Sequence, residues 1–220
     1  LISANMQSQK IYSEKIGILM INIQSVRAHQ AELSYHLQVE RPHIVLLQET
    51  WLDASTEDVR FQDYDVVSRR DRSDSPNRGG ILTLKRSDFN HIVHVSTSVH
   101  EERAWYLLNL DPEVILIGNW YRPGASEHDG FKILYEEVAA FTTEFTGMIL
   151  MGDLNVHHAK WLRFSNGNSI VGADLKAFSE NYGLHQSVQE PTRNDYLLDL
   201  LLTDIAGAKV KVGSYVADHK

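Results

Sequence analysis

Short runs of apolar residues, separated by polar stretches, are the main feature of the chain. Residues 16–23 contain a single polar position, Asn22, and similar runs cover residues 44–47 and 148–151. Such runs are typical of strands that are buried on both faces of a sheet. Leucines at a spacing of four within residues 29–40 predict an amphipathic helix between the first two runs. The first third of the chain is therefore predicted to form strand, helix and strand.

The rest of the chain predicts more strands and two further helices. Apolar residues at three- and four-residue spacings predict a long helix over residues 127–145, and another helix is expected at residues 173–181. Asp111-Pro112-Glu113 has the composition of a hairpin turn. This order of elements predicts an α/β fold with two sheets. The further strands are expected at residues 64–67, 81–85, 91–95, 105–110, 114–121, 196–203 and 210–216.

No linker or internal repeat divides the chain. We therefore interpret residues 1–15 as a polar lead-in and residues 16–220 as a single domain, which is long enough to bury a sizeable core. The chain does not begin with Met, and we expect it to be cut from a longer protein. The absence of Cys excludes disulfides, thiolate metal sites and a Cys nucleophile. No apolar run is long enough to cross a membrane, so no membrane partner is expected.

The charge balance is acidic. The 21 Lys and Arg against 29 Asp and Glu give a formal net charge of −8. A protein that binds nucleic acid through bulk positive charge would usually be basic, so the composition argues against that class of binder. It does not argue against an enzyme whose site is itself acidic. The densest basic stretch, residues 69–86, either follows DNA phosphates or forms a solvated loop.

Acids and amides recur at the ends of the apolar strands. Asn22, Glu49, Asp153 with Asn155, and Asp218 all occupy such positions. Ligand sites of α/β sheets lie at strand ends, although any one of these residues alone also fits a turn or a cap. Asp153 and Asn155 are two apart, so on an extended segment they project to the same side and can orient a water molecule. Glu49 and Asp218 offer the hard oxygen ligands that Mg²⁺ prefers.

Six motifs occur in order along nearly the whole chain, from Ile16 to His219. They are Asn22 after an apolar strand, Leu47-Gln48-Glu49-Thr50, Trp120-Tyr121-Arg122-Pro123, Gly152-Asp153-Leu154-Asn155, Leu198-Asp199 and Asp218-His219. Together they resemble the endonuclease/exonuclease/phosphatase superfamily, which includes deoxyribonuclease-I-like and apurinic-site endonucleases. The resemblance implies a four-layered α/β sandwich, in which two mixed β-sheets pack face to face with helices outside.

Further segments narrow the resemblance. They are residues 22–27, 48–52, 78–81, 121–123 and 190–193 ahead of 198–200, with Asn155, His158 and Trp161. These resemble the endonuclease domain of non-LTR (LINE-type) retrotransposons. Gln24 stands where apurinic endonucleases carry Asp, and His157 where inositol-polyphosphate phosphatases carry Arg. Ala217 replaces the Ser that often precedes the final Asp-His, so a phosphate-facing hydroxyl is missing. The chain ends one residue after His219, and we expect the closing strand of the domain to be cut off.

The resemblance implies hydrolysis of a phosphodiester with one divalent ion, Mg²⁺ or alternatively Mn²⁺. Glu49 would bind the ion, with Asn22 and Asp218 in or near its coordination shell. Asp153 would orient and deprotonate the attacking water, and Asn155 would position it.

The other implied roles concern the phosphate. His219 would contact the scissile phosphate, and Asp199 would hold the His219 imidazole in one orientation. Tyr121 would donate a hydrogen bond to a phosphate oxygen. The residues expected to contact the substrate are Thr192, Arg122 and Asn22.

The function implied by the resemblance is the nicking of DNA to start target-primed reverse transcription. The expected partners are double-stranded DNA and a reverse transcriptase domain of the same polyprotein, and the expected place of action is intracellular, at nuclear DNA. Two alternatives stay open. One is a phosphoesterase of the same fold that acts on lipid or inositol phosphates, and the other is a catalytically inactive DNA-binding remnant.

Overall fold

Two mixed β-sheets form the centre of the molecule. The computed structural model describes residues 1–6, 15–56, 59–72, 78–124, 130–214 and 216–217. Sheet A has the strand order β12-β1-β2-β3-β5-β4, and sheet B has the order β10-β11-β9-β8-β7-β6. The strands of sheet A are β1 (Ile2–Met6), β2 (Ile16–Asn22), β3 (Ile44–Gln48), β4 (Tyr64–Arg70), β5 (Ile81–Arg86) and β12 (Lys209–Val212). Those of sheet B are β6 (Ile92–Thr97), β7 (Glu102–Asn109), β8 (Val114–Tyr121), β9 (Gly147–Asp153), β10 (His185–Gln186) and β11 (Asp199–Thr203).

The central strands of sheet A, β2 and β3, are buried on both faces, which accounts for their continuous apolar runs. Along β2, Ile18 and Met20 join the core between the two sheets. The alternate residues, Leu19 and Ile21, join a second core with Leu33 of the first helix. Successive side chains of a strand point to opposite faces, so a strand between two cores needs apolar residues at nearly every position.

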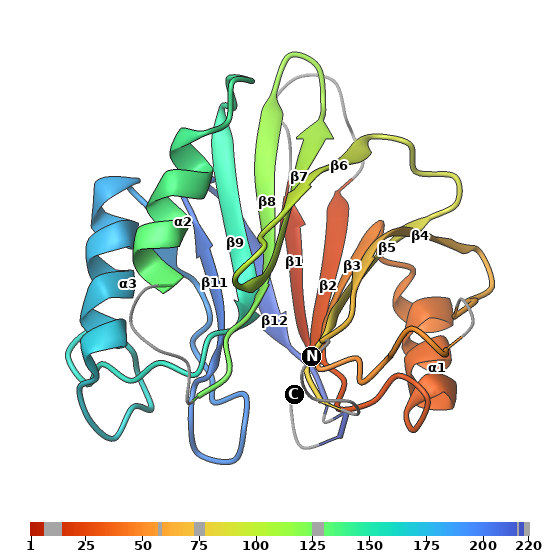
Figure 1. The fold of residues 1–220 in the computed structure, drawn as a ribbon, viewed down its shortest axis with the longest axis horizontal. Helices are drawn as coiled ribbons and strands as arrows, with labels where there is room; N and C mark the ends of the chain where they lie inside the picture. The colour runs from red at the N-terminus through yellow and green to blue at the C-terminus, as the bar shows by residue number, and fades with distance from the viewer. Residues whose placement is uncertain (7–14, 57–58, 73–77, 125–129, 215, 218–220) are drawn as a thin grey trace.

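Three helices cover the outer faces of the sheets (Figure 1). Helix α1 (Gln30–Glu40) lies against sheet A, while α2 (Gly130–Ala139) and α3 (Ile170–Asn181) lie side by side against sheet B. The order of layers is therefore helix, sheet, sheet, helix, and the predicted four-layered α/β sandwich is confirmed. Among the described residues, no helix is long and apolar enough to cross a membrane.

The N-terminal segment corrects one prediction. Residues 2–6 belong to β1, which pairs with β2 on one side and β12 on the other, whereas residues 1–15 were expected to be a lead-in. Ile2 and Ala4 are fully buried in the core between the sheets. A strand this short has too few apolar positions to stand out in the sequence, and only its pairing with two neighbours identifies it. Residues 7–14 lie outside the described residues.

The ends of several elements also differ from prediction. Helix α2 ends at Ala139 rather than residue 145, and the expected start at residues 127–129 lies outside the described residues. Phe141 still packs edge-to-face on Trp105, with ring centroids 5.8 Å apart, so its apolar position reflects burial outside a helix. Strands β11 and β12 are shorter than expected, and the two-residue β10 was not predicted.

Candidate active site

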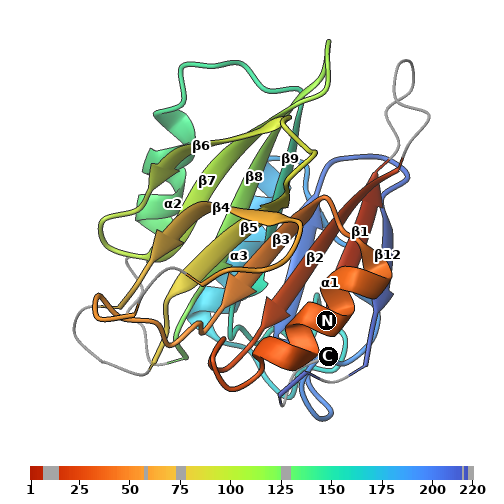
Figure 2. The same ribbon diagram turned by 90° about the vertical axis from the view of Figure 1, so that its right-hand side faces the viewer.

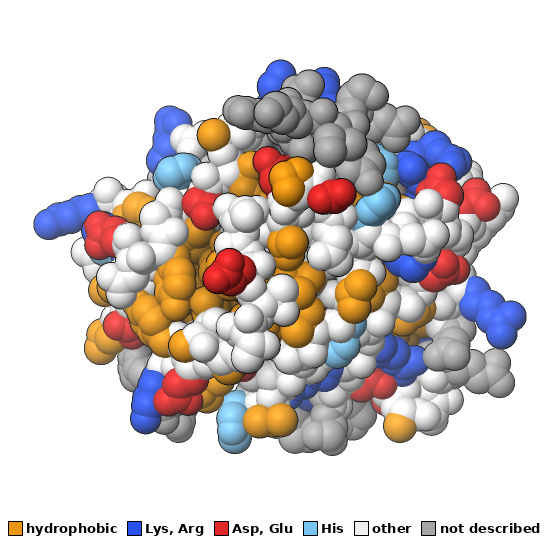
Figure 3. All heavy atoms as spheres, turned by 90° about the horizontal axis from the view of Figure 1, so that it is seen from above, with side chains coloured by type: hydrophobic (Ala, Val, Ile, Leu, Met, Phe, Trp, Pro, Cys, Tyr) orange, Lys and Arg blue, Asp and Glu red, His pale blue; other side chains and the backbone are white. Residues whose placement is uncertain are grey.

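The predicted site residues of both sheets lie at one edge of the sandwich. Strands β2 and β3 run parallel, as do β8 and β9, so Asn22, Tyr121 and Asp153 end their strands at the same edge. Figures 1 and 2 show these strands pointing toward the lower edge of the molecule. The opposite face, seen in Figure 3, carries interspersed acidic, basic and apolar side chains.

Asn22 connects the two sheets at this edge. Its Nδ2 donates to Asp153 Oδ2 at 2.8 Å and to Glu49 Oε1 at 3.2 Å. Asn22 and Asp153 are buried, and Asn22 Oδ1 accepts no hydrogen bond from any described residue. A buried acceptor without a donor is costly. The oxygen is therefore available to a cation, and it lies on the same amide that contacts the Glu49 carboxylate.

Glu49 is held in place by two further donors. Tyr121 Oη donates to Glu49 Oε1 at 2.9 Å, and Trp51 Nε1 donates to Glu49 Oε2 at 3.0 Å. The contact of Trp51 with Glu49 was not predicted from the sequence. Both Glu49 and Trp51 have a positive φ, of 51° and 53°, so the chain turns sharply directly after β3. This turn brings the Trp51 ring back onto the carboxylate two positions earlier.

Tyr121 acts as a donor at this site. Burial and the neighbouring Glu49 carboxylate raise the pKa of the Tyr121 phenol well above its usual range. The phenol therefore keeps its proton at neutral pH. In the structure the proton is donated to Glu49, and the bond to a phosphate oxygen that the resemblance implies stays a prediction.

Asp153 ends β9, and Asn155 lies in the tight turn that follows. Asp153 Oδ1 accepts from the Asn155 backbone N–H at 3.3 Å, and Asn155, with a φ of 45°, donates through Nδ2 to the Arg122 carbonyl at 2.9 Å. A Cβ atom at Gly152 would lie 1.7 Å from the Trp120 carbonyl oxygen, so only glycine fits there. The two predicted water-orienting side chains are thus fixed next to one another.

Arg122 and Thr192 have roles that differ from the predicted substrate contacts. Arg122 is 3% exposed, and its guanidinium donates to the carbonyls of Leu154 and Asn155 at 3.5 and 3.4 Å. Thr192 is fully buried, and its Oγ1 accepts from the backbone N–H groups of Leu198 and Asp199 at 3.2 and 3.0 Å. Both side chains are buried and bond to backbone groups of the segments that carry Asn155 and Asp199, so they help to position those segments.

Asp199 lies next to Asp153 across two paired strands. The antiparallel register of β9 and β11 places the two residues directly opposite each other, and both are buried. Asp218 and His219, the predicted metal ligand and phosphate contact, lie outside the described residues. Val216, two positions before Asp218, is buried in the same cluster as Ile21 and Ile23 at the end of β2. Among the described side chains, no group of three His, Asp or Glu could hold a metal ion.

A cavity of about 570 Å³ opens over Glu49 and Tyr121. Its lining includes three guanidinium groups, from Arg72, Arg78 and Arg193. An acidic protein therefore has a locally basic opening at this edge, which favours an anionic ligand. Most cations of the basic stretch are engaged within the protein, including Arg72, which forms an ion pair with Glu102. Arg69 pairs with Asp71, Lys85 with Asp65 and Arg86 with Asp88.

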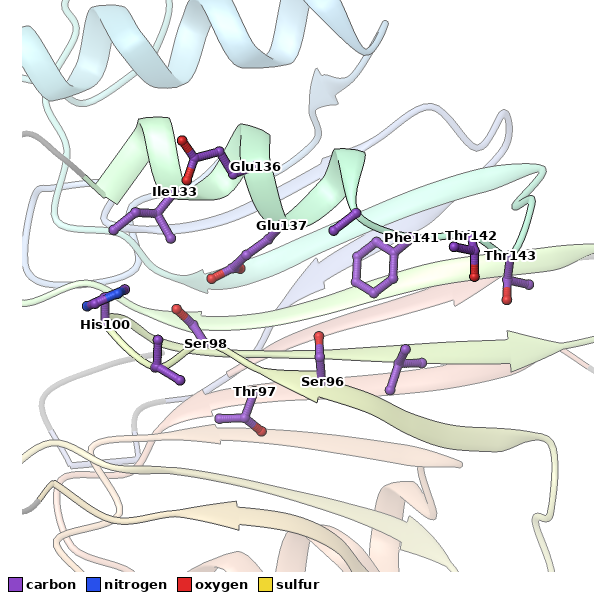
Figure 4. A pocket seen from close by; sticks show the side chains of 13 residues that line it. Ser96, Thr97, Ser98, His100, Ile133, Glu136, Glu137, Phe141, Thr142 and Thr143 are labelled. Atoms are coloured by element: carbon purple, nitrogen blue, oxygen red, sulfur yellow. The ribbon is translucent and has the colours of Figure 1, made fainter.

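A second cavity of about 520 Å³ lies between β6 and α2 (Figure 4). Its apolar lining residues include Val95, Val99 and Phe141. Its partly buried carboxylate, that of Glu137, accepts from Arg103 Nε and Trp105 Nε1, both at 2.7 Å. Burial alone would raise the pKa of Glu137, but the hydrogen bond and charge of Arg103 outweigh burial and lower the pKa. None of the predicted site residues lines this cavity.

Comparisons with known proteins agree with this geometry. The model of the Endonuclease/Exonuclease/phosphatase family matches residues 2–169. The endonuclease domain of TRAS1, a telomere-specific non-LTR retrotransposon, superposes with a TM-score of 0.66 at 16% identity over 84% of this chain and 82% of that one. An AP endonuclease from Archaeoglobus fulgidus gives a TM-score of 0.61 at 16% identity over 86% of each chain. The 3′ phosphatase NExo from Neisseria, bound to a product DNA hairpin, gives 0.61 at 16% identity over 84% and 86%. Comparison with curated protein sequences finds no match.

The fold and the acid-and-amide edge define a protein of the phosphoesterase class. The matched region covers more than half of the chain, and the chain belongs to the Endonuclease/Exonuclease/phosphatase family. The structural likenesses, all below 20% identity, show the fold.

Proposed function

We propose that this protein is a metal-dependent endonuclease that nicks DNA to prime reverse transcription of a non-LTR retrotransposon. The observation that carries the proposal is the contact of the Asn22 amide with both Glu49 and Asp153. One carboxylate is partly open to the cavity and the other is buried beside it. Because the two carboxylates lie in such different surroundings, one can bind the cation while the other activates water.

The chain offers a suitable oxygen set for Mg²⁺ or Mn²⁺. Glu49 would provide the carboxylate and Asn22 the Oδ1 atom that accepts no hydrogen bond, with Asp218 as a third ligand from the C-terminal segment. When bound, the cation supplies Lewis acidity and neutralises charge that develops on the leaving oxygen. Trp51 and Tyr121 hold the Glu49 carboxylate toward that position.

The remaining groups act on water and phosphate. Asp153 accepts a proton from the attacking water, and Asn155 orients that water from the adjoining turn. Asp199 holds the imidazole of His219, which contacts the scissile phosphate. Arg72, Arg78 and Arg193 provide the positive lining that an entering phosphodiester backbone requires.

The proteins of similar structure support DNA as the substrate. TRAS1 is described as a telomere-specific non-LTR retrotransposon, and the Neisseria enzyme is bound to a product DNA hairpin. We extend this to double-stranded DNA for the present chain and to a reverse transcriptase as part of the same polyprotein. An intracellular place of action at nuclear DNA follows from that assignment.

Nicking of supercoiled plasmid tests the proposal. With Mg²⁺ the protein should convert supercoiled into open-circular DNA, and EDTA should stop the reaction. Asp153→Asn and His219→Ala should each reduce nicking to background while leaving the circular dichroism spectrum unchanged. Release of phosphate from a lipid or inositol phosphate without nicking, DNA binding without turnover, or nicking that survives both substitutions would each contradict the proposal.

A further inference from the structure

Glu102 is a buried residue of sheet B that links the two sheets. It begins β7 in sheet B, is buried, and accepts from the Gly80 backbone N–H at 2.6 Å, next to β5 in sheet A. It also forms an ion pair with Arg72. Burial raises the pKa of Glu102, and the Arg72 guanidinium and the Gly80 N–H oppose the rise because they favour the ionised carboxylate.

A chain of backbone contacts leads from Glu102 to Glu49. The Gly80 and Gly79 carbonyls accept from the N–H groups of Thr50 and Trp51 at 3.3 and 2.9 Å. Gly80 has a φ of 85°, and a Cβ atom there would lie 2.5 Å from Thr50 Oγ1, so the close approach requires glycine. The segment that Glu102 anchors is therefore the one against which the Glu49 turn is built.

Arg72 brings a positive charge close to the same carboxylate. Its guanidinium lies over the Tyr121 ring, 5.7 Å from the centroid, and Tyr121 donates to Glu49. Arg72 and Glu49 line one cavity. A guanidinium pairs readily with a carboxylate in a partly buried setting. Without a partner of its own, Arg72 would compete with a cation for Glu49.

We propose that Glu102 is a positioning residue that keeps Arg72 away from Glu49 and so leaves the Glu49 carboxylate to the metal. The inference rests on the proposed function, because it assumes that Glu49 binds a divalent cation. Glu102 acts in two ways. Its charge retains the Arg72 guanidinium, and its second oxygen anchors Gly80 and with it the turn that carries Glu49.

The variant Glu102→Gln separates these two actions. The amide oxygen of Gln can still accept from Gly80, whereas the charge that retains Arg72 is lost. We expect the Kd for Mn²⁺, measured without DNA by electron paramagnetic resonance of free Mn²⁺, to rise about tenfold or more, as for other groups that orient a metal ligand. The double variant Glu102→Gln with Arg72→Met should regain most of the lost affinity because the competing charge is gone.

Two further variants keep the test decisive. Arg72→Met alone should bind Mn²⁺ at least as tightly as the unmodified protein. Glu137→Gln is a matched control, because it breaks another ion pair of β7, that of the buried Arg103 with the partly buried Glu137 of α2. Residues 102 and 103 point to opposite faces of the strand, so this control should lower the melting temperature without changing Mn²⁺ affinity.

Three outcomes would overturn the inference. These are an unchanged Kd in Glu102→Gln, a double variant as weak as that single variant, or a tenfold loss of affinity in Arg72→Met. If the variants bind Mn²⁺ in the expected order of affinity but the unmodified protein nicks no DNA, the proposed function alone is overturned. A protein that binds no Mn²⁺ would overturn both.

Discussion

At the scale of single residues, the Glu49 carboxylate is oriented without being neutralised. Its donors are the Asn22 amide, the Trp51 indole and the Tyr121 phenol, all of them uncharged. Such donors restrict the side chain but leave its full negative charge for a cation. Oxygen ligands that are already oriented lose less conformational freedom when a cation binds. Each hydrogen-bond donor to Glu49 is therefore expected to contribute to metal affinity.

Trp51→Phe tests that expectation. The substitution keeps the aromatic ring and removes the Nε1 donor to Glu49 Oε2, so we expect about tenfold weaker Mn²⁺ binding. One partly exposed hydrogen bond contributes only ~1 kcal/mol to the free energy of unfolding, so the melting temperature should hardly move. Trp161→Phe is the control, because Trp161 packs edge-on against His158 and is not among the residues that line the cavity over Glu49. Equal Mn²⁺ affinity in both variants would contradict the role given to Trp51.

At the scale of elements, the start of β11 fixes the acids of sheet B. Asp199 is the first residue of β11 and faces Asp153, the last residue of β9. The preceding turn closes through Thr192, whose backbone N–H donates to the Tyr196 carbonyl at 2.8 Å. The Thr192 hydroxyl then accepts from the N–H groups where the strand begins. The position of Asp199 therefore depends on a side chain seven residues away.

Thr192→Val should weaken this junction. It leaves the buried N–H groups of Leu198 and Asp199 without their acceptor, which costs about 1–3 kcal/mol of the free energy of unfolding. Urea denaturation measures this loss, and plasmid nicking should fall with it. Thr192→Ser retains the hydroxyl and should lose much less. A Val variant as stable as the Ser variant would show that the hydroxyl contacts do not hold the strand.

At the scale of the whole molecule, the charge is unfavourable for DNA except at the cavity. The net charge is −8, while the lining of the cavity over Glu49 includes three Arg. Long-range repulsion and local attraction therefore oppose each other. The local attraction acts through close contacts with phosphates, and these contacts weaken as the salt concentration rises.

We accordingly expect weak, salt-sensitive binding of double-stranded DNA by this chain alone. The Kd should be about 10⁻⁶ M or weaker at ~150 mM salt and should improve as the salt is lowered. A gel-shift series over salt concentration, made in EDTA to prevent cleavage, measures it. The triple substitution of Arg72, Arg78 and Arg193 by Gln should flatten the salt dependence. Tight binding at ~150 mM salt would mean that other surfaces contribute.

The sequence by itself determined the α/β class with two sheets and the strand ends at which the chemistry lies, and its resemblance to a known family implied the four layers. Apolar runs at residues 16–23, 44–47 and 148–151 predicted strands with two buried faces, and they form β2, β3 and β9. An acid or amide at the end of each parallel strand then had to meet its counterparts at one edge. Asn22 and Asp153 were predictable for this reason, because a local pattern fixes where a strand ends.

Only the tertiary structure decided how those residues are held. The Trp51 contact with Glu49, the burial of Arg122 and Thr192, and the Glu102 link to Gly80 all depend on contacts that the local pattern leaves open. Strand β1 likewise exists through its pairing with β2 and β12. Hydrophobic periodicity specifies which face of an element is buried, but not which distant polar group meets it there. That choice is made by strand order and by the packing of one sheet on the other.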